Sequence, residues 1–230
     1  MLTVTHMFWG YVLGRITLNF FKDRNFNPFL LLLCGAIPDF DLISHIVLQR
    51  FFAIREPYGT LLGHHGLAHS WLVITVAFLL ISLSVGIKAF PYCVATLQHV
   101  IFGDFVTNEV PLYFPSSLDQ YGLRIYLNEI SIALEIFGMV LFLLFLKKDA
   151  ELFNKPKGFS HLLLLSLPLI FLHLRYSFIY FQEGGLLPLY SLYGILSSIL
   201  FFSILIPSYL NLYLTKRKAE SMDQEEKRSI

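Results

Sequence analysis

Residues 67–88 read LAHSWLVITVAFLLISLSVGIK, and no acidic or basic side chain lies between His69 and Lys88. An α-helix rises 1.5 Å per residue, so a helix of this length extends about 33 Å and matches the roughly 30 Å hydrocarbon core of a bilayer. The stretch therefore predicts a membrane-spanning helix with a histidine, His69, in its first turn.

Further apolar stretches along the chain also predict helices, at about residues 2–21, 28–37, 90–106, 125–146, 159–181 and 187–214. The last three of these are long enough to span a bilayer. The 28–37 stretch is too short, because it begins at Asn27-Pro28 and ends at Pro38. These lengths predict an all-α, polytopic membrane helical bundle of about five to seven membrane segments, with some of the first four short or half-spanning.

The composition agrees with residence in a membrane. Hydrophobic residues make up 56% of the chain and charged residues 14%, and the mean hydropathy is +0.64. A typical soluble domain has roughly 45–50% apolar and about 25% charged residues. The formal net charge of +1 argues against a nucleic-acid-binding protein, which would show a basic patch or stripe.

The basic residues predict the topology. With residues 22–27, Lys88, residues 147–157 and the C-terminus in the cytoplasm, most Lys and Arg residues lie inside, as the positive-inside rule requires. Those on the opposite side are Arg50, Arg55 and Arg124. We expect a single membrane-embedded domain over 1–214, with a metal-site half at 1–118 and anchoring helices at 119–214, then a disordered, charged cytoplasmic tail at 215–230.

Histidines and aspartates concentrate in the first half of the chain. Six of the eight histidines precede residue 100. Imidazole and carboxylate groups are ligands for divalent transition metals, and ionisable groups within a membrane usually have a function. Measured along the predicted helices, His6, Asp39, His69 and His99 all lie toward the outer half of the membrane. This shared depth favours a metal cavity on the extracytoplasmic side.

The sharpest local motif is Pro38-Asp39-Phe40-Asp41, a turn in which two carboxylates can converge on one cation. The alternative is that an aspartate caps the following helix. His64 and His69 bracket Gly66 at the mouth of the 67–88 helix, where they either bind a metal or form a polar helix end at the membrane interface. His65 is a candidate contact to substrate.

His99 and Asp104 are five residues apart, which places them about 140° apart on a regular helix. They share one face only if Gly103 ends the helix or a π-bulge interrupts it, and such bulges are frequent at functional sites. His6, taken alone, is typical of a buried core histidine. Because the chain contains other candidate metal ligands, His6 can also be interpreted as a metal ligand.

Taken together, these motifs resemble the DUF457, or YdjM-like, family of inner-membrane proteins described as metal-dependent hydrolases. The matching pieces cover roughly residues 1–118: His6, the segment 35–41 (GAIPDFD), His64-x-Gly66-x-x-His69-Ser70, and His99 with Asp104 before 110–115 (VPLYFP). The resemblance implies a metal held by His6, Asp39, Asp41, His64, His69, His99 and Asp104. It also implies a distant likeness to zinc-dependent phospholipase C and P1-type nucleases. The family usually has Arg where this chain has His65, and its His-x-x-x-Asp motif is one residue longer here.

We therefore expect a membrane-embedded, metal-dependent hydrolase of the inner membrane, with its site on the extracytoplasmic side and its C-terminus in the cytoplasm. The expected cofactor is a divalent metal, with zinc favoured and two ions as an alternative. Asp41, Asp104 and His65 are the candidate catalytic residues. A lipid or lipid-linked substrate suits this depth, and the phospholipase likeness favours a phosphoester, whose phosphate His65 or Arg124 would meet. The alternatives are a divalent-metal transporter or sensor and a non-catalytic membrane scaffold.

Overall fold

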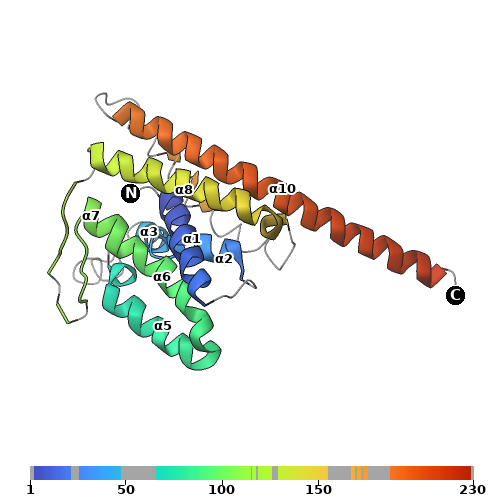
Figure 1. The fold of residues 1–230 in the computed structure, drawn as a ribbon, viewed down its shortest axis with the longest axis horizontal. Helices are drawn as coiled ribbons and strands as arrows, with labels where there is room; N and C mark the ends of the chain where they lie inside the picture. Colours follow the sequence, from blue (N-terminus) through green and yellow to red (C-terminus); the bar gives the residue numbers. More distant parts are fainter. Residues whose placement is uncertain are drawn as a thin grey trace.

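The computed structural model describes residues 3–21, 26–47, 66–114, 116–117, 119–125, 129–154, 167–168, 170–171, 174–175 and 187–228. Over these residues the regular structure is helical, apart from one antiparallel bridge between Val110 and Tyr121. The predicted all-α fold is confirmed (Figure 1).

The elements follow one another as α1 (Thr3–Phe20), α2 (Pro28–Ala36), α3 (Phe40–Val47), the 3₁₀ turn η2 (Leu67–His69), α5 (Trp71–Val85), the 3₁₀ turn η3 (Gly86–Ala89), α6 (Phe90–Gln98), the π-helix η4 (His99–Asp104), α7 (Phe105–Thr107), α8 (Glu129–Asn154) and α10 (Leu187–Arg228). Helix α2 starts as the sequence predicts, because the Asn27 side chain accepts hydrogen bonds from the amides of Phe29 and Leu30.

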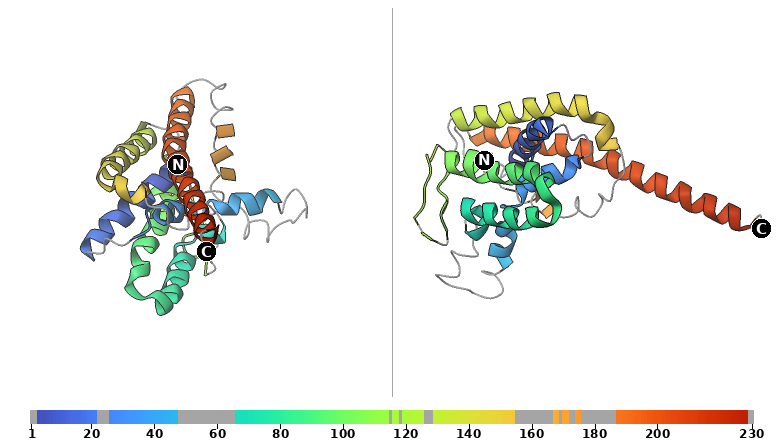
Figure 2. Two further views of the ribbon diagram at one scale, coloured as in Figure 1. Left: turned by 90° about the vertical axis from the view of Figure 1, so that its right-hand side faces the viewer. Right: turned by 60° about the horizontal axis from the view of Figure 1, so that its bottom comes forward.

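Helix α1 is the centre of the bundle and packs against α2, α6, α8 and α10 (Figures 1 and 2). Its Phe8 ring stacks on Phe142 of α8 with 4.3 Å between ring centroids. Gly10 lets α2 approach closely, because a Cβ at this position would lie 2.6 Å from the Cα of Gly35. Small residues at a crossing are the usual means of close helix packing in membranes.

A buried ion pair joins α1 to α8. Arg15 donates from Nε to Asp149 at 2.7 Å and from Nη2 to the other carboxylate oxygen at 3.2 Å. The Tyr11 hydroxyl donates to the same carboxylate at 2.8 Å. The two charges are thus paired and hydrogen-bonded, as charges buried within a protein must be.

The predicted 67–88 helix differs in its first turn and at its end. Helix α5 begins only at Trp71, because the Ser70 side chain caps it by accepting from the Val73 amide. It ends at Gly86, whose φ of +68° is a left-handed conformation that glycine adopts without strain. The chain reverses there, so that α5 and α6 lie side by side (Figure 1).

Two helical stretches are long and apolar enough to cross a membrane: Trp71–Thr107, which includes the reversal at Gly86, and Ile130–Phe153. They become three if the pair α2 and α3, bent by 53°, is counted as one span. Most of the expected 159–181 segment lies outside the described residues. The described part of the chain is therefore a membrane helical bundle with two to three candidate spans, by length and composition.

The C-terminal tail differs from the expectation of disorder. Helix α10 runs without interruption from Leu187 to Arg228, and its last part projects from the bundle (Figure 1). The tail is rich in Lys, Arg, Ala, Glu, Gln and Met, which are strong helix formers. Because extending an existing helix avoids the cost of nucleation, these residues continue a helix that the apolar segment has begun.

Candidate metal centre

Four separate parts of the fold bring His6, Asp39, His69, His99 and Asp104 together. His6 comes from the first turns of α1, Asp39 from the turn between α2 and α3, and His69 from η2. His99 and Asp104 are the two ends of the π-helix. All five residues are buried, and each histidine has an exposed fraction of 0%.

Asp104 is the carboxylate at the middle of this cluster. Its Oδ2 lies 3.0 Å from Nε2 of His69 and 3.1 Å from Nε2 of His99. Its other oxygen lies 3.7 Å from Nε2 of His6. The cluster therefore presents three imidazole rings around one carboxylate.

Asp39 approaches the same imidazoles. Its Oδ1 is 3.4 Å from Nε2 of His99 and 3.9 Å from Nε2 of His69. The His6 and His99 rings stack at 3.6 Å between centroids. Asp39 therefore lies within 4 Å of both His69 and His99.

The π-helix explains how two residues five apart reach one point. Its wider turn pairs residues i and i+5, so His99 and Asp104 face the same way instead of diverging by about 140° as on a regular helix. Of the two alternatives open from the sequence, the π-helical one is found. Gly103 also makes room for His6, because a Cβ there would lie 1.9 Å from Cε1 of the His6 ring.

Two hydrogen bonds fix the orientation of the imidazole rings. Nδ1 of His99 donates to the Gly35 carbonyl at 2.7 Å, which leaves Nε2 as the lone-pair nitrogen of a neutral ring. Nδ1 of His69 lies 2.7 Å from Oδ2 of Asp41. Metal-binding histidines are commonly held in this way by a carbonyl or carboxylate behind the ring.

The close contacts between Oδ2 of Asp104 and the Nε2 atoms do not have hydrogen-bond geometry. Several buried polar atoms of the cluster therefore have no hydrogen-bond partner among the described residues: both ring nitrogens of His6, Oδ2 of Asp39, Nε2 of His99 and Oδ2 of Asp104. Buried polar atoms are rarely left in this state. Two sets, His6–Asp39–His99 and His69–His99–Asp104, place their donor atoms close enough to hold a metal ion. The residues present therefore fit a divalent cation.

The other predicted site residues fall in different places. Asp41 stands behind His69 rather than among the converging atoms, while His64 and His65 lie outside the described residues. Arg124 is exposed and its Nη2 pairs with Glu109 at 2.5 Å, so its charge is already matched. The phosphate contact expected of Arg124 therefore has no support in this arrangement.

Two residues beside the cluster were not predicted from the sequence. Gln98 has an exposed fraction of 3%, and its Nε2 donates to the His6 carbonyl at 2.8 Å; its position next to His99 was the only indication in the sequence. The steric role of Gly103 was not predicted either, although a glycine directly before Asp104 could have indicated it.

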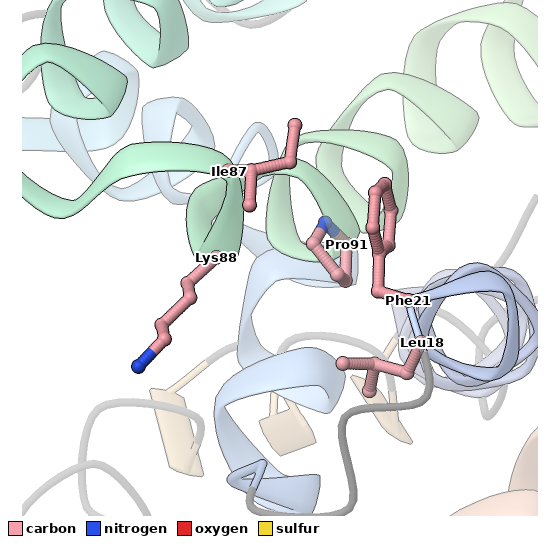
Figure 3. Close-up of a pocket in the computed structure, with 5 residues that line it drawn as sticks. All are labelled: Leu18, Phe21, Ile87, Lys88 and Pro91. Atoms are coloured by element: carbon pink, nitrogen blue, oxygen red, sulfur yellow. The ribbon is translucent and has the colours of Figure 1, made fainter.

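A pocket at the other end of α1 is separate from this cluster. It is lined by Leu18, Phe21, Ile87, Lys88 and Pro91 (Figure 3). Leu18 follows His6 by twelve residues on one helix, a rise of about 18 Å. The pocket is thus remote from the imidazoles, and it is mainly apolar.

A family model described as YdjM inner membrane protein matches residues 1–186. The chain belongs to this family. The matched residues include every member of the buried cluster, and the predicted resemblance to YdjM-like proteins is confirmed. Searches of curated proteins and of solved structures gave no match to the chain. Membership establishes a membrane protein, and the chemistry must be argued from the cluster itself.

Proposed function

We propose that this YdjM-family protein is a membrane-embedded, metal-dependent hydrolase that acts on a lipid or lipid-linked phosphoester. The observation that carries the proposal is the buried cluster of His6, Asp39, His69, His99 and Asp104, in which polar atoms of His6, Asp39, His99 and Asp104 have no hydrogen-bond partner among the described residues. Carboxylates buried among apolar helices are costly unless a cation neutralises them. A divalent metal ion removes this cost.

The geometry favours one ion at this cluster rather than two. Both candidate ligand sets include His99, whose Nδ1 is already used by the Gly35 carbonyl. Only Nε2 of His99 remains, and one nitrogen lone pair binds one ion. The mixture of imidazole and carboxylate donors suits zinc, although other first-row divalent metals accept the same set.

The residues of the chain have distinct proposed roles. His6, Asp39, His69, His99 and Asp104 hold the ion. Asp41 keeps Nδ1 of His69 in place and is a positioning residue. A divalent ion supplies hydrolysis with a water of lowered pKa and with polarisation of a phosphoryl or acyl oxygen. Burial of the cluster strengthens these electrostatic effects because it excludes bulk water.

The experiment begins with metal analysis of the full chain purified in detergent, followed by hydrolysis assays on phospholipids and prenyl phosphates. Asp39→Ala and His69→Ala should lose metal and activity together. The matched control is Asp119→Ala, since Asp119 is an exposed loop aspartate whose carboxylate meets Ser117. This control should keep both metal and activity.

Chelation gives a second readout that does not depend on the substrate. A chelator should lower the thermal stability of the wild type, because a ligand that binds only the folded state stabilises it. The same chelator should have little effect on Asp39→Ala. If Asp39→Ala retains its full metal content and activity, Asp39 is a structural residue and the proposal fails.

One observation favours metal transport as the second candidate function. Glu135 of α8 is fully buried, and it accepts a hydrogen bond from Thr5, the neighbour of His6 in α1, at 3.2 Å. Polar groups therefore continue from the cluster into the bundle, as a cation pathway requires. Under transport, Glu135→Gln should reduce metal uptake into proteoliposomes. If the protein is a hydrolase instead, the Glu135→Gln variant should keep its metal content and catalyse no metal uptake.

A further inference from the structure

Three aromatic side chains form a half-exposed group, here called the aromatic cluster, beside the metal centre. They are Trp71, Tyr113 and Tyr121, with exposed fractions of 39%, 43% and 38%. Trp71 meets Tyr113 edge-on at 6.5 Å between centroids, and Tyr113 meets Tyr121 edge-on at 5.5 Å. This edge-to-face geometry is the favourable one for aromatic rings, so the cluster is an ordered surface.

Hydrogen bonds tie the aromatic cluster to the segment that carries His69. The Ser70 hydroxyl, next to His69, lies 3.2 Å from the Leu112 carbonyl and 2.7 Å from the Phe114 carbonyl on either side of Tyr113. The amides of Val110 and Tyr121 each donate to the carbonyl of the other at 3.0 Å. Trp71 follows His69 by two residues, so the chain between them spans at most about 7 Å. The aromatic cluster and the metal centre therefore lie at nearly the same level.

The aromatic cluster joins two segments that differ in polarity. Beyond Trp71, α5 buries Ile74 but exposes a series of apolar side chains: Val76, Leu79, Leu80 and Leu83, at 47%, 62%, 61% and 85%. Residues 108–125, which carry Tyr113 and Tyr121, also carry the Glu109–Arg124 ion pair and the exposed Asp119, with Leu123 as an exposed apolar side chain. Aromatic side chains therefore occur where an apolar helix face adjoins a segment with charged side chains.

Aromatic side chains between an apolar helix face and charged residues are typical of a membrane boundary. Trp and Tyr are enriched where the hydrocarbon core meets the head groups, because each ring has an apolar body and a polar edge. An apolar helix face that is exposed in a membrane protein is the face that contacts lipid tails. The aromatic cluster continues that lipid-facing surface of α5 up to the polar segment.

We propose that the aromatic cluster fixes the membrane boundary at the level of the metal centre, so that the site receives the head-group region of a lipid from the surrounding leaflet. The bond to be cleaved then lies in the head-group region, at the lipid phosphate. The membrane placement stands on the aromatic cluster alone. Its catalytic consequence rests on the proposed hydrolase function.

Depth-dependent fluorescence quenching tests the placement. The chain has two tryptophans, so the Trp9→Phe variant leaves Trp71 as the only emitter. In vesicles of phosphatidylethanolamine and phosphatidylglycerol, a nitroxide on the lipid head group should quench Trp71 more than a nitroxide near the end of an acyl chain. The matched control is Trp9→Phe/Trp71→Phe/Leu79→Trp. Position 79 lies eight residues further along α5, about 12 Å deeper, and should show the opposite preference.

Two quenching results would overturn the placement. In one, Trp71 is quenched as strongly by the deep nitroxide as the tryptophan at position 79. In the other, Trp71 is quenched by aqueous iodide and by neither lipid nitroxide. The first would put the aromatic cluster inside the hydrocarbon core, and the second would put it in water away from the bilayer.

Enzyme kinetics test the catalytic consequence. Tyr113→Ala and Tyr121→Ala should raise KM several-fold for a phospholipid in vesicles, with kcat and metal content unchanged. Neither variant should alter the hydrolysis of bis(4-nitrophenyl) phosphate, a soluble phosphodiester that needs no membrane contact. Equal losses on both substrates would overturn the role of the aromatic cluster. If the wild type hydrolyses neither substrate, the hydrolase proposal fails, and the quenching result still decides the membrane placement.

Discussion

Gly103→Ala is the sharpest test of the metal centre, because its effect should be opposite to that of the same change elsewhere in a helix. Replacing glycine by alanine within a helix ordinarily stabilises it by up to about 1 kcal/mol. At position 103 the new Cβ would lie 1.9 Å from Cε1 of His6, whereas ordinary contacts begin at 3.4 Å. The His6 ring must therefore move by about 1.5 Å. Metal–ligand distances tolerate only about 0.2 Å, so His6 should be lost as a ligand.

We expect Gly103→Ala to lower the free energy of unfolding by about 1–3 kcal/mol, the usual cost of overpacking a core. Metal affinity should fall with it. The His6→Ala background removes the ring, so there the second substitution should be neutral or stabilising and should not lower metal affinity further. Isothermal titration with metal and unfolding in mixed detergent micelles measure both quantities for the four proteins of this double-mutant cycle. Equal destabilisation by Gly103→Ala in both backgrounds would refute the placement of His6 against the π-helix.

Three further predictions concern other parts of the molecule. Asp41→Asn should weaken metal binding about 10–100-fold, because it removes the carboxylate that orients the His69 ring. Asp104→Ala should abolish metal binding, and metal titration distinguishes the two effects. Asp149→Ala leaves Arg15 buried without its partner, so the free energy of unfolding should fall by about 3–5 kcal/mol. Metal affinity should be retained, and a loss of metal binding in the still-folded variant would contradict this prediction. Cysteines placed at 152 and 222 should be labelled by an impermeant reagent only after the cells are opened, because the distribution of basic residues predicts a cytoplasmic location for both positions; labelling in intact cells would contradict the predicted topology.

The Arg15–Asp149 pair and the metal centre lie at different ends of helix α1. His6 lies in the first turns of α1, and Arg15 lies nine residues further on, about 14 Å along the axis. One end of α1 is held by its ion pair with α8, and the other end presents His6 to the cluster. This arrangement explains why stability and metal binding should respond to different substitutions.

The sequence by itself determined the fold class and most of the cluster. Uninterrupted apolar stretches such as 71–85 leave the backbone no alternative to helix within a membrane, since only intrahelical hydrogen bonds can satisfy it there. The cost of burying ionisable groups pointed to His6, Asp39, His69, His99 and Asp104 before any contact was known, among seven candidates that also included Asp41 and His64.

Tertiary structure alone decided the roles within the cluster. Asp39 and Asp41 look equivalent in the sequence, but the turn after α2 directs Asp39 toward the imidazole Nε2 atoms while Asp41 approaches Nδ1 of His69. The π-helix and the space beside Gly103 depend on the His6 ring, which comes from a helix about one hundred residues away in the chain. The local sequence pattern indicates which ionisable side chains need a partner. Only the packing of α1 against α2 and α6 determines which partner each of them meets, because that choice depends on contacts between segments distant in sequence.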